Sequence, residues 1–504
     1  MDESCLYLNI WMPPGAQTDS AKLPVFVWIH GGGFQAGSGS EPLYDGAKLA
    51  SLGLVVVSIN YRLGIMGFHR PKGDADYNCG LWDQVEALKW VQMNIVNFGG
   101  DPTNVTIAGE SAGGISVFLL TASPVANKLF RRAIVMSCIA YHCVNVDIMD
   151  SLAEIVARAA TGSSSATAED MRTLSAESLL ATQAGQQDLA PTQDVMGVGI
   201  GLGWYQGGQR LNHLGKLYKA AGPMHFLVPG VDRRTNVGFG GHMVYTPVVG
   251  DELLPRMPLD LIADGSGAHI DLLVGSNREE QAFCPFPAAP GHSAPSTFGG
   301  EVKTMEDAVA RCAREIMSLG KVTDPVLTAQ KLIACYISAE QEGGVAKAGT
   351  MQHVWDRLSS DMAFNASTIM VATRRHQHNR GKTFVYRYDG RNNSRAFHGW
   401  EMMFALGNLP GGLDTKPTLT KFRDVMLGAW ARFTLTGDPN GAPGIPTWAP
   451  WDSTGSDGVV MRFDMAGCST CAYTEAAPAI GEVIGLIDHA YPHTSRTPIP
   501  ASRL

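Results

Sequence analysis

The feature that most constrains the fold is the stretch NVTIAGESAGGISVF at residues 104–118. A β-branched apolar run leads into GESAG at 109–113, and an apolar helical pattern follows. In a strand, tight turn and helix of this kind, glycines on both sides let the strand and the helix approach each other, and the turn pushes the hydroxyl of Ser111 out at the top of a sheet. A lone G-x-S-x-G arises easily by chance, but the strand before it and the helix after it make it specific. The stretch therefore predicts an exposed, nucleophilic serine at the end of a buried strand.

A second glycine-rich turn lies upstream of the first. The run PVFVWI at 24–29 is typical of a buried strand, and it ends in HGGGF at 30–34. Attack of a serine on a carbonyl creates a negative oxygen that backbone N–H groups must receive. The H-G-G-G loop supplies part of such an oxyanion hole in α/β-hydrolases, and the N–H after the nucleophile supplies the rest. We therefore expect the hole to be formed by the N–H groups of Gly32, Gly33 and Ala112; the alternative is a flexible glycine turn.

These motifs occur in an order that resembles the type-B carboxylesterases, the family of the cholinesterases, bacterial p-nitrobenzyl esterases and fungal lipases. The matching stretches are CLYLNIW (5–11), HGGGF (30–34), NYRLG (60–64), GLWDQ (80–84), WVQMNI (90–95), FGGDP (98–102), GESAGG (109–114), FTLTGDPN (433–440) and WAPW (448–451). The resemblance covers residues 3 to about 452, is most specific over 3–137 and is loose over about 140–245. It implies an α/β-hydrolase fold with a large, mostly parallel central sheet, helices on both faces and an inserted cover over the active site. It also implies that the family's N-terminal segment before Cys5 is absent, together with the cysteine that normally pairs with Cys5.

The resemblance also assigns an acid, since the triad of this fold runs Ser, Asp or Glu, then His along the chain. The family places the acid five residues after a strand-ending glycine, which is Glu280 in this sequence. A buried carboxylate there orients the imidazole and stabilises the imidazolium. Glu279 is the alternative and is expected to be a solvated neighbour, whereas Gln281 departs from the family's usual glycine. Glu110, beside the nucleophile, is expected to anchor the turn through buried hydrogen bonds.

Fourteen histidines compete for the role of base. The run TFVYRY at 383–388 alternates as a strand does, and after a polar turn the chain reads RAFHGWE at 395–401. A histidine on the loop after a late strand is placed to reach the nucleophile, and His398 matches the family's base. His376 and His378 are the alternatives, but both are expected on the exposed face of a helix over 355–378.

Strands alternate with helices along the chain, which is the pattern of a doubly wound sheet. We expect strands over 6–11, 25–30, 54–60, 104–109, 132–137, 271–275, 383–388 and 459–464, and helices over about 80–97, from 112 and over 418–435. The motifs build a single sheet, so one domain is predicted over 1–490. The long separation of Ser111 from Glu280 leaves room for a cover over about 140–250. The tail 491–504 has little to bury and is expected to be disordered.

The composition excludes several kinds of partner. The chain has 504 residues and a net charge of −8, so a basic face for nucleic acid is not expected. No stretch reaches the ~18 apolar residues of a membrane span. Residues 1–4 lack the basic and apolar regions of a signal peptide, but with the family's N-terminal segment missing the compartment stays open. Nine cysteines include Cys468 and Cys471 in a lone C-x-x-C, which favours a disulfide or two buried thiols over a zinc site.

The walls of the site come from stretches with little resemblance. Residues 284–300 are expected to line the rim, and Cys138, which stands where the family usually has glycine, is expected to alter the wall behind the nucleophile. Trp204, Tyr205 and Trp400 are candidates for the aromatic box that choline recognition needs, although plain apolar lining is the more ordinary role.

The resemblance implies a serine carboxylic-ester hydrolase that acts through an acyl-serine on uncharged small to medium esters, without metal or cofactor. An acyltransferase or cyclising enzyme would use the same acyl-serine and exclude water, and a competing alcohol would distinguish it. A catalytically silent binding or adhesion protein of the family would lack a triad residue. The sequence assigns no oligomeric state.

Overall fold

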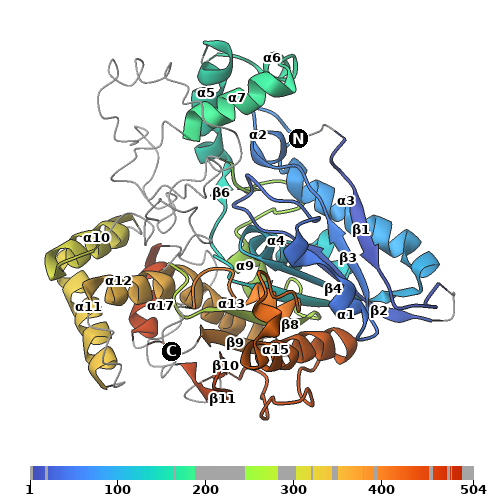
Figure 1. The fold of residues 1–504 in the computed structure, drawn as a ribbon. Coiled ribbons are helices and arrows are strands. Elements are labelled where there is room, and N and C mark those ends of the chain that lie inside the picture. The colour runs from blue at the N-terminus through green and yellow to red at the C-terminus, as the bar shows by residue number, and fades with distance from the viewer. Residues whose placement is uncertain are drawn as a thin grey trace.

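A mostly parallel sheet of nine strands organises the computed structural model (Figure 1). The structure describes residues 4–17, 21–163, 165–187, 245–281, 302–318, 322–342, 350–378, 380–390, 396–452, 458–473, 477 and 479–490. The strand order is β1 (Leu8–Trp11), β3 (Val55–Ile59), β2 (Leu23–Ile29), β4 (Gly100–Glu110), β5 (Arg132–Met136), β8 (Asp271–Asn277), β9 (Thr383–Gly390), β10 (Val459–Asp464) and β11 (Gly467–Ala472). Among these strands only the outer pairs β1–β3 and β10–β11 are antiparallel. The predicted fold class is confirmed, and β11 is the one strand of this sheet that the sequence did not predict.

Alternating side chains of the strands build two apolar layers, one on each face of the sheet. Val25, Val27 and Ile29 of β2 face the first layer, whereas Phe26 and Trp28 face the second. The first layer is covered by α3 (Cys79–Asn94), α4 (Ala112–Ala122), α12 (Met351–Ser360), α13 (Ala366–His376) and α17 (Ile480–Ala490). The second is covered by α1 (Ala47–Ala50), α14 (Met402–Ala405) and α15 (Pro417–Thr436). Helices on both faces hold the strands rigidly, so the strand ends are fixed points on which a site can be built.

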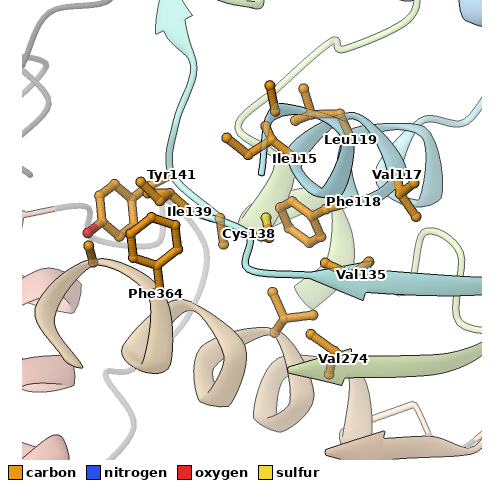
Figure 2. Packing of buried hydrophobic residues seen from close by; sticks show 14 of the residues in the cluster. Ile115, Val117, Phe118, Leu119, Val135, Cys138, Ile139, Tyr141, Val274 and Phe364 are labelled. Carbon is orange, nitrogen blue, oxygen red and sulfur yellow. The ribbon is translucent and has the colours of Figure 1, made fainter. Parts of the chain in front are cut away.

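Part of the first layer lies directly beneath the site. Figure 2 shows Phe118 of α4 close to Val135 of β5 and Val274 of β8, with Phe364 approaching from another helical segment. Phe364 belongs to a π-helical turn (Asp361–Asn365) that joins α12 to α13, so the helix predicted over 355–378 has an irregular centre. Further elements are α9 (Pro258–Ala263), α10 (Met305–Ser318), α11 (Pro325–Glu342) and short 3₁₀ turns at Pro42–Tyr44, Ile95–Phe98, Ala126–Lys128 and Leu413–Thr415.

Between β5 and β8 the chain leaves the main sheet. β6 (Val144–Asn145) and β7 (Val248–Val249) form a small parallel pair, and α5 (Val146–Thr161), α6 (Ala168–Arg172) and α7 (Ala176–Gln187) follow β6. We call residues 146–187 the α5–α7 segment; it lies beside α2 (Gly64–Phe68), as Figure 1 shows. The rest of the predicted cover up to residue 244, and the tail 491–504, lie outside the described residues.

The two cysteines of the C-x-x-C lie on β11 and are not joined to each other by a disulfide. Because an odd separation along a strand turns two side chains to opposite faces, Cys468 packs against the second apolar layer and Cys471 against the first. The two half-buried cysteines therefore do not pair with each other, because they lie on opposite faces of the sheet. None of the helices in the described part of the chain combines the length and the apolar character that a bilayer crossing would need.

Candidate active site

Ser111 occupies a strained turn between β4 and α4. Its backbone has φ 58° and ψ −125°, and its N–H donates to the Met136 carbonyl at 3.1 Å, which ties the turn to β5. A Cβ added at Gly113 would lie 2.0 Å from the Ile29 carbonyl oxygen, and one at Gly109 would lie 2.6 Å from the Gly113 carbonyl carbon. Both positions flanking the serine therefore need glycine, as the sequence motif predicts.

The structure brings together the three residues that the sequence singled out from distant parts of the chain. Ser111 Oγ lies 2.8 Å from His398 Nε2, and His398 Nδ1 lies 2.7 Å from Glu280 Oε2. A hydrogen bond donated by Nδ1 to the carboxylate leaves Nε2 as the acceptor of the serine proton. The arrangement can therefore deprotonate the serine, while the catalytic roles themselves stay predictions.

The Glu280 carboxylate is fully buried and is held by two donors besides His398. Ser137 Oγ and the Asn277 N–H both donate to its Oε1, each at 2.6 Å. Sequence reasoning did not assign these two residues to the site. They lie where β5 and β8 end, and the C-terminal ends of neighbouring parallel strands are where polar site residues gather. Their position at or just after the ends of predicted strands was the signal that could have identified them.

Glu401 is a further buried carboxyl group that sequence reasoning left without a role. Its Oε1 lies 3.2 Å from Ser137 Oγ, and the side-chain amide of Asn277 donates to its Oε2. Burial, followed by the negative charges of Glu280 and Glu110, raises the pKa of Glu401 to about 8. Burial thus disfavours the charged form of Glu401 beside the Glu280 network.

Glu110 differs from its predicted role as an anchor of the turn. Its Oε1 lies 3.3 Å from His398 Nε2 and has no hydrogen-bond partner among the described residues. Burial raises the pKa of Glu110 to about 7, against the lowering effect of the His398 charge, and the Glu280 charge raises it further. This carboxyl group thus faces the imidazole from the serine side, opposite Glu280.

The protonated form of His398 is favoured by its surroundings. Burial alone would lower the pKa of His398, but the carboxyl groups of Glu110, Glu280 and Glu401 outweigh it and raise the pKa to about 9. The Phe364 ring packs on the imidazole with 5.0 Å between ring centroids. The site therefore stabilises the imidazolium, which is the form that appears when the base has taken a proton from serine.

The glycine-rich loop passes close to the serine. A Cβ at Gly31 would lie 3.1 Å from Ser111 Cβ, and Gly32 and Gly33 have φ 113° and 62°. Among the described residues, neither the Gly32 N–H nor the Gly33 N–H meets a backbone acceptor, and Ala112 begins α4. The first N–H groups of a helix have no partner within the helix. The three N–H groups predicted to form the oxyanion hole are thus not used by backbone hydrogen bonds within the described residues.

The alternative residues lie elsewhere. Two expectations about them were wrong. Glu279 is buried, not solvated, and its Oε1 lies 3.8 Å from His353 Nδ1. His376 and His378 are half-buried at the end of α13, not exposed, because this helix packs into the core on all sides; His376 Nε2 lies 3.3 Å from Asp452 Oδ1, and His378 Nε2 lies 2.7 Å from the Ala263 carbonyl oxygen.

The wall behind the nucleophile includes Cys138, which is buried beside Phe118 where the chain leaves β5 (Figure 2). The Trp400 ring lies 4.5 Å from that of Phe397. Trp204, Tyr205 and the predicted rim 284–300 lie outside the described residues. Within the described part of the chain, no group of three or more His, Cys, Asp or Glu side chains is arranged to hold a metal ion.

Comparison with known proteins places this geometry in context. The sequence pattern of the Carboxylesterase family matches residues 1–203 and 219–478. The para-nitrobenzyl esterase of Bacillus subtilis (strain 168) is 31% identical over 451 residues, which cover 87% of this chain and 75% of that protein. The fumonisin B1 esterase of Sphingopyxis macrogoltabida is 50% identical over 143 residues, 27% of this chain and 26% of that protein. A solved para-nitrobenzyl esterase structure superposes with a TM-score of 0.70 at 28% identity and covers 96% of this chain and 84% of that one.

Proposed function

The chain belongs to the carboxylesterase family, and from this premise we propose that Ser111 is its nucleophile, His398 its general base and Glu280 the acid that orients the base. The protein is a serine carboxylic-ester hydrolase, and enzymes of this kind work through an acyl-serine intermediate. The observation that carries the residue assignment is the pair of contacts at 2.8 Å and 2.7 Å that links the three side chains.

In the acylation step, His398 Nε2 takes the proton from Ser111 Oγ, and Oγ forms a bond to the ester carbonyl carbon. The electron pair of the C=O bond moves to the oxygen, which the N–H groups of Gly32, Gly33 and Ala112 receive. The protonated His398 then gives its proton to the leaving alkoxide as the C–O bond of the ester breaks. In deacylation His398 Nε2 takes a proton from water, whose oxygen forms a bond to the acyl carbon. The bond from that carbon to Ser111 Oγ then breaks, and His398 returns the proton to Oγ as the carboxylic acid leaves.

We propose that the substrates are uncharged esters with small to medium acyl groups. The carboxyl groups around His398 would repel an anionic acyl group. The pKa values of Glu110 and Glu401 are raised, which lowers the negative charge of the site and makes it a poor binding site for a cation. The side chains of Cys138, Ile139 and Phe364 add apolar surface nearby. The net charge of −8 also supports a small-molecule partner over a nucleic acid.

We also propose that residues 1–490 form one domain and that residues of about 140–250 cover the active site. The nine strands from β1 to β11 belong to one sheet, which supports a single domain. The α5–α7 segment follows β5 and β6, and β4, the neighbour of β5, ends at the serine, which supports the position of the cover.

The test is hydrolysis of p-nitrophenyl acetate and butyrate by the wild-type protein and by Ser111→Ala, with an organophosphonate label located by mass spectrometry. We expect kcat/KM to fall by at least about 10⁴-fold in Ser111→Ala, because the triad acts as a unit, and the label to lie on Ser111. Ser116→Ala, which removes a buried serine of α4 away from the turn, is the matched control.

A label on another serine, or an active Ser111→Ala, would overturn the assignment. In the presence of a competing alcohol, ester product in large excess over acid would identify an acyltransferase. A kcat/KM for choline esters above that for neutral butyrate esters would contradict the proposed preference for uncharged substrates.

A further inference from the structure

The glycine-rich loop that carries two of the proposed oxyanion donors is held from outside by α2. The Gly64 N–H, at the start of α2, donates to the Phe34 carbonyl at 2.6 Å, and Phe34 directly follows Gly33. The Phe34 ring also packs on Phe68 at the other end of α2, with 4.7 Å between ring centroids. Because Phe34 is fully buried and has φ 60°, a conformation that costs energy in a non-glycine residue, it depends on such contacts.

α2 is itself held by the α5–α7 segment. The side-chain oxygen of Gln183, on α7, accepts the N–H of Ile65 at 2.9 Å in a buried contact. The first N–H groups of a helix need partners from outside it. In α2 the Gly64 N–H bonds to the Phe34 carbonyl, and the Ile65 N–H bonds to the side chain of Gln183. The two bonds thus attach adjacent residues of α2 to the oxyanion loop on one side and to α7 on the other.

The backbone of α2 leaves a place for this glutamine. Gly64 has φ 55°, and a Cβ there would lie 2.0 Å from Gln183 Oε1 and 2.6 Å from its Nε2. The amide group therefore rests against the bare Cα of Gly64, where any side chain would displace it. The other polar contacts of the α5–α7 segment with the body include the exposed ion pairs Arg172–Asp74 and Lys72–Glu154 and the part-buried pair Arg70–Asp150. The Gln183 contact differs from them because it is buried and reaches the backbone of α2.

We infer that Gln183 is a positioning residue of the oxyanion hole, which couples docking of the α5–α7 segment, through α2 and Phe34, to the Gly33 N–H. The inference rests on the proposed function, since it takes Gly32 and Gly33 as oxyanion donors. Gln183 touches neither substrate nor the reacting atoms. Its loss frees α2 to shift, and the shift reaches the donor two peptide units from the Phe34 carbonyl. An N–H that is displaced weakens its bond to the oxyanion, which exists only after attack on the carbonyl.

The experiment compares Gln183→Met, which keeps the length of the side chain and removes the acceptor, with Gln183→Glu, which keeps an acceptor oxygen. Active sites are counted by organophosphonate burst so that rates refer to folded enzyme. In Gln183→Met we expect kcat to fall about tenfold, while KM stays within a factor of two of the wild-type value. This fall in kcat is smaller than the fall on removal of an oxyanion donor, because the donor is displaced and not lost. The inhibition constant of a trifluoromethyl ketone, which forms a tetrahedral oxyanion on the serine, should rise by the same factor. Gln183→Glu should recover most of the rate.

Thr182→Ala is the matched control, because the Thr182 hydroxyl bonds within α7, to the Ser178 carbonyl. A second route uses Gly64→Ala, whose Cβ pushes the Gln183 amide away. If both changes act through one contact, Gly64→Ala combined with Gln183→Met should be no worse than the more impaired single variant, apart from the backbone strain of alanine at a positive φ.

Three results would overturn the inference: full kcat in Gln183→Met, a rise in KM without a change in the trifluoromethyl ketone constant, or additive losses in the double variant. A fall in thermal stability at unchanged kcat per active site would likewise assign Gln183 a purely structural role. If the proposed function itself were wrong, the organophosphonate would fail to label Ser111 in the wild-type protein, so the two failures are distinguishable.

Discussion

The body of the sheet and the α5–α7 segment are held by different kinds of interaction. Around Ser111 the body relies on backbone atoms in close approach and on fully buried side chains, such as the Ser137 hydroxyl on Glu280. The α5–α7 segment buries apolar side chains such as Met149 and Val156, but its ion pairs with the body lie mostly at the surface. In the pair Arg172–Asp74, at 2.6 Å, the arginine side chain is 49% exposed.

This difference teaches where the site tolerates change. A backbone approach of 2–3 Å leaves no room for an added atom, whereas an exposed ion pair contributes only about 0–1 kcal/mol and is screened by salt. Catalytic geometry should therefore fail abruptly when the body is altered. Changes to the surface ion pairs of the α5–α7 segment should act weakly and depend on ionic strength.

The largest expected effect comes from Gly113→Ala, which breaks the close approach in the body. The added Cβ would lie 2.0 Å from the Ile29 carbonyl oxygen, so β2 and α4 must separate. We expect the free energy of unfolding to fall by about 3 kcal/mol or more and activity to be lost with it. Urea unfolding followed by tryptophan fluorescence measures the change.

Gly428→Ala, on α15, is the control for this substitution. Its Cβ would meet only the Ala442 Cβ, at 3.7 Å, so the change should be neutral or stabilising by about 0.5–1 kcal/mol, since glycine is unfavourable in a helix interior. Equal free energies of unfolding for Gly113→Ala and Gly428→Ala would contradict the expectation. The close approach at Gly113 would then tolerate an added side chain.

The sequence predicted the site correctly where its residues lie in one short stretch. Gly109, Ser111 and Gly113 lie within five residues, and the need of a tight turn for glycine made their geometry predictable. The assignments of Glu280 and His398 depended on resemblance, and the structure places both at the serine. The fold class followed from the alternation of strands and helices.

What the sequence did not reveal arises from pairing between distant segments. The contacts of Ser137 with Glu280 and Glu401 require β5 to lie next to β8, and no local pattern states which strand ends meet. Glu110 was placed on the correct turn, but its approach to His398 depends on a loop far along the chain. Burial of Glu279 has the same origin, since its environment is built by α12 and not by its neighbours in sequence.

A smaller effect is expected from Glu110→Gln, which keeps the shape of the body and changes its electrostatics. Loss of a carboxylate near Nε2 removes one group that raises the pKa of His398, so that pKa should fall. The neutral base then persists to lower pH, and the acid limb of kcat/KM should move toward lower pH by about one unit. Initial rates with p-nitrophenyl butyrate between pH 6 and 11, corrected for spontaneous hydrolysis, measure the shift.

The matched control is Glu86→Gln on the exposed face of α3, which removes the same charge far from the imidazole. An unchanged acid limb in Glu110→Gln, or an equal shift in both variants, would mean that the charge at Glu110 does not act on His398. Packing would then remain as the property that distinguishes the body from the α5–α7 segment, and buried charge would not.

The smallest effect concerns the surface attachment of the α5–α7 segment. Arg172→Ala removes the contacts with Asp74 and Asp76, and exposed pairs of this kind contribute about 0.5 kcal/mol. Hydrogen exchange of peptides from α6 should therefore quicken about twofold at low salt, while β4 should keep its protection. At 0.5 M NaCl the wild-type protein and the variant should exchange alike in α6, because salt screens the pair. Faster exchange in β4 as well would contradict the separation of the two regions, since an exposed ion pair would then support the strand that ends at Ser111.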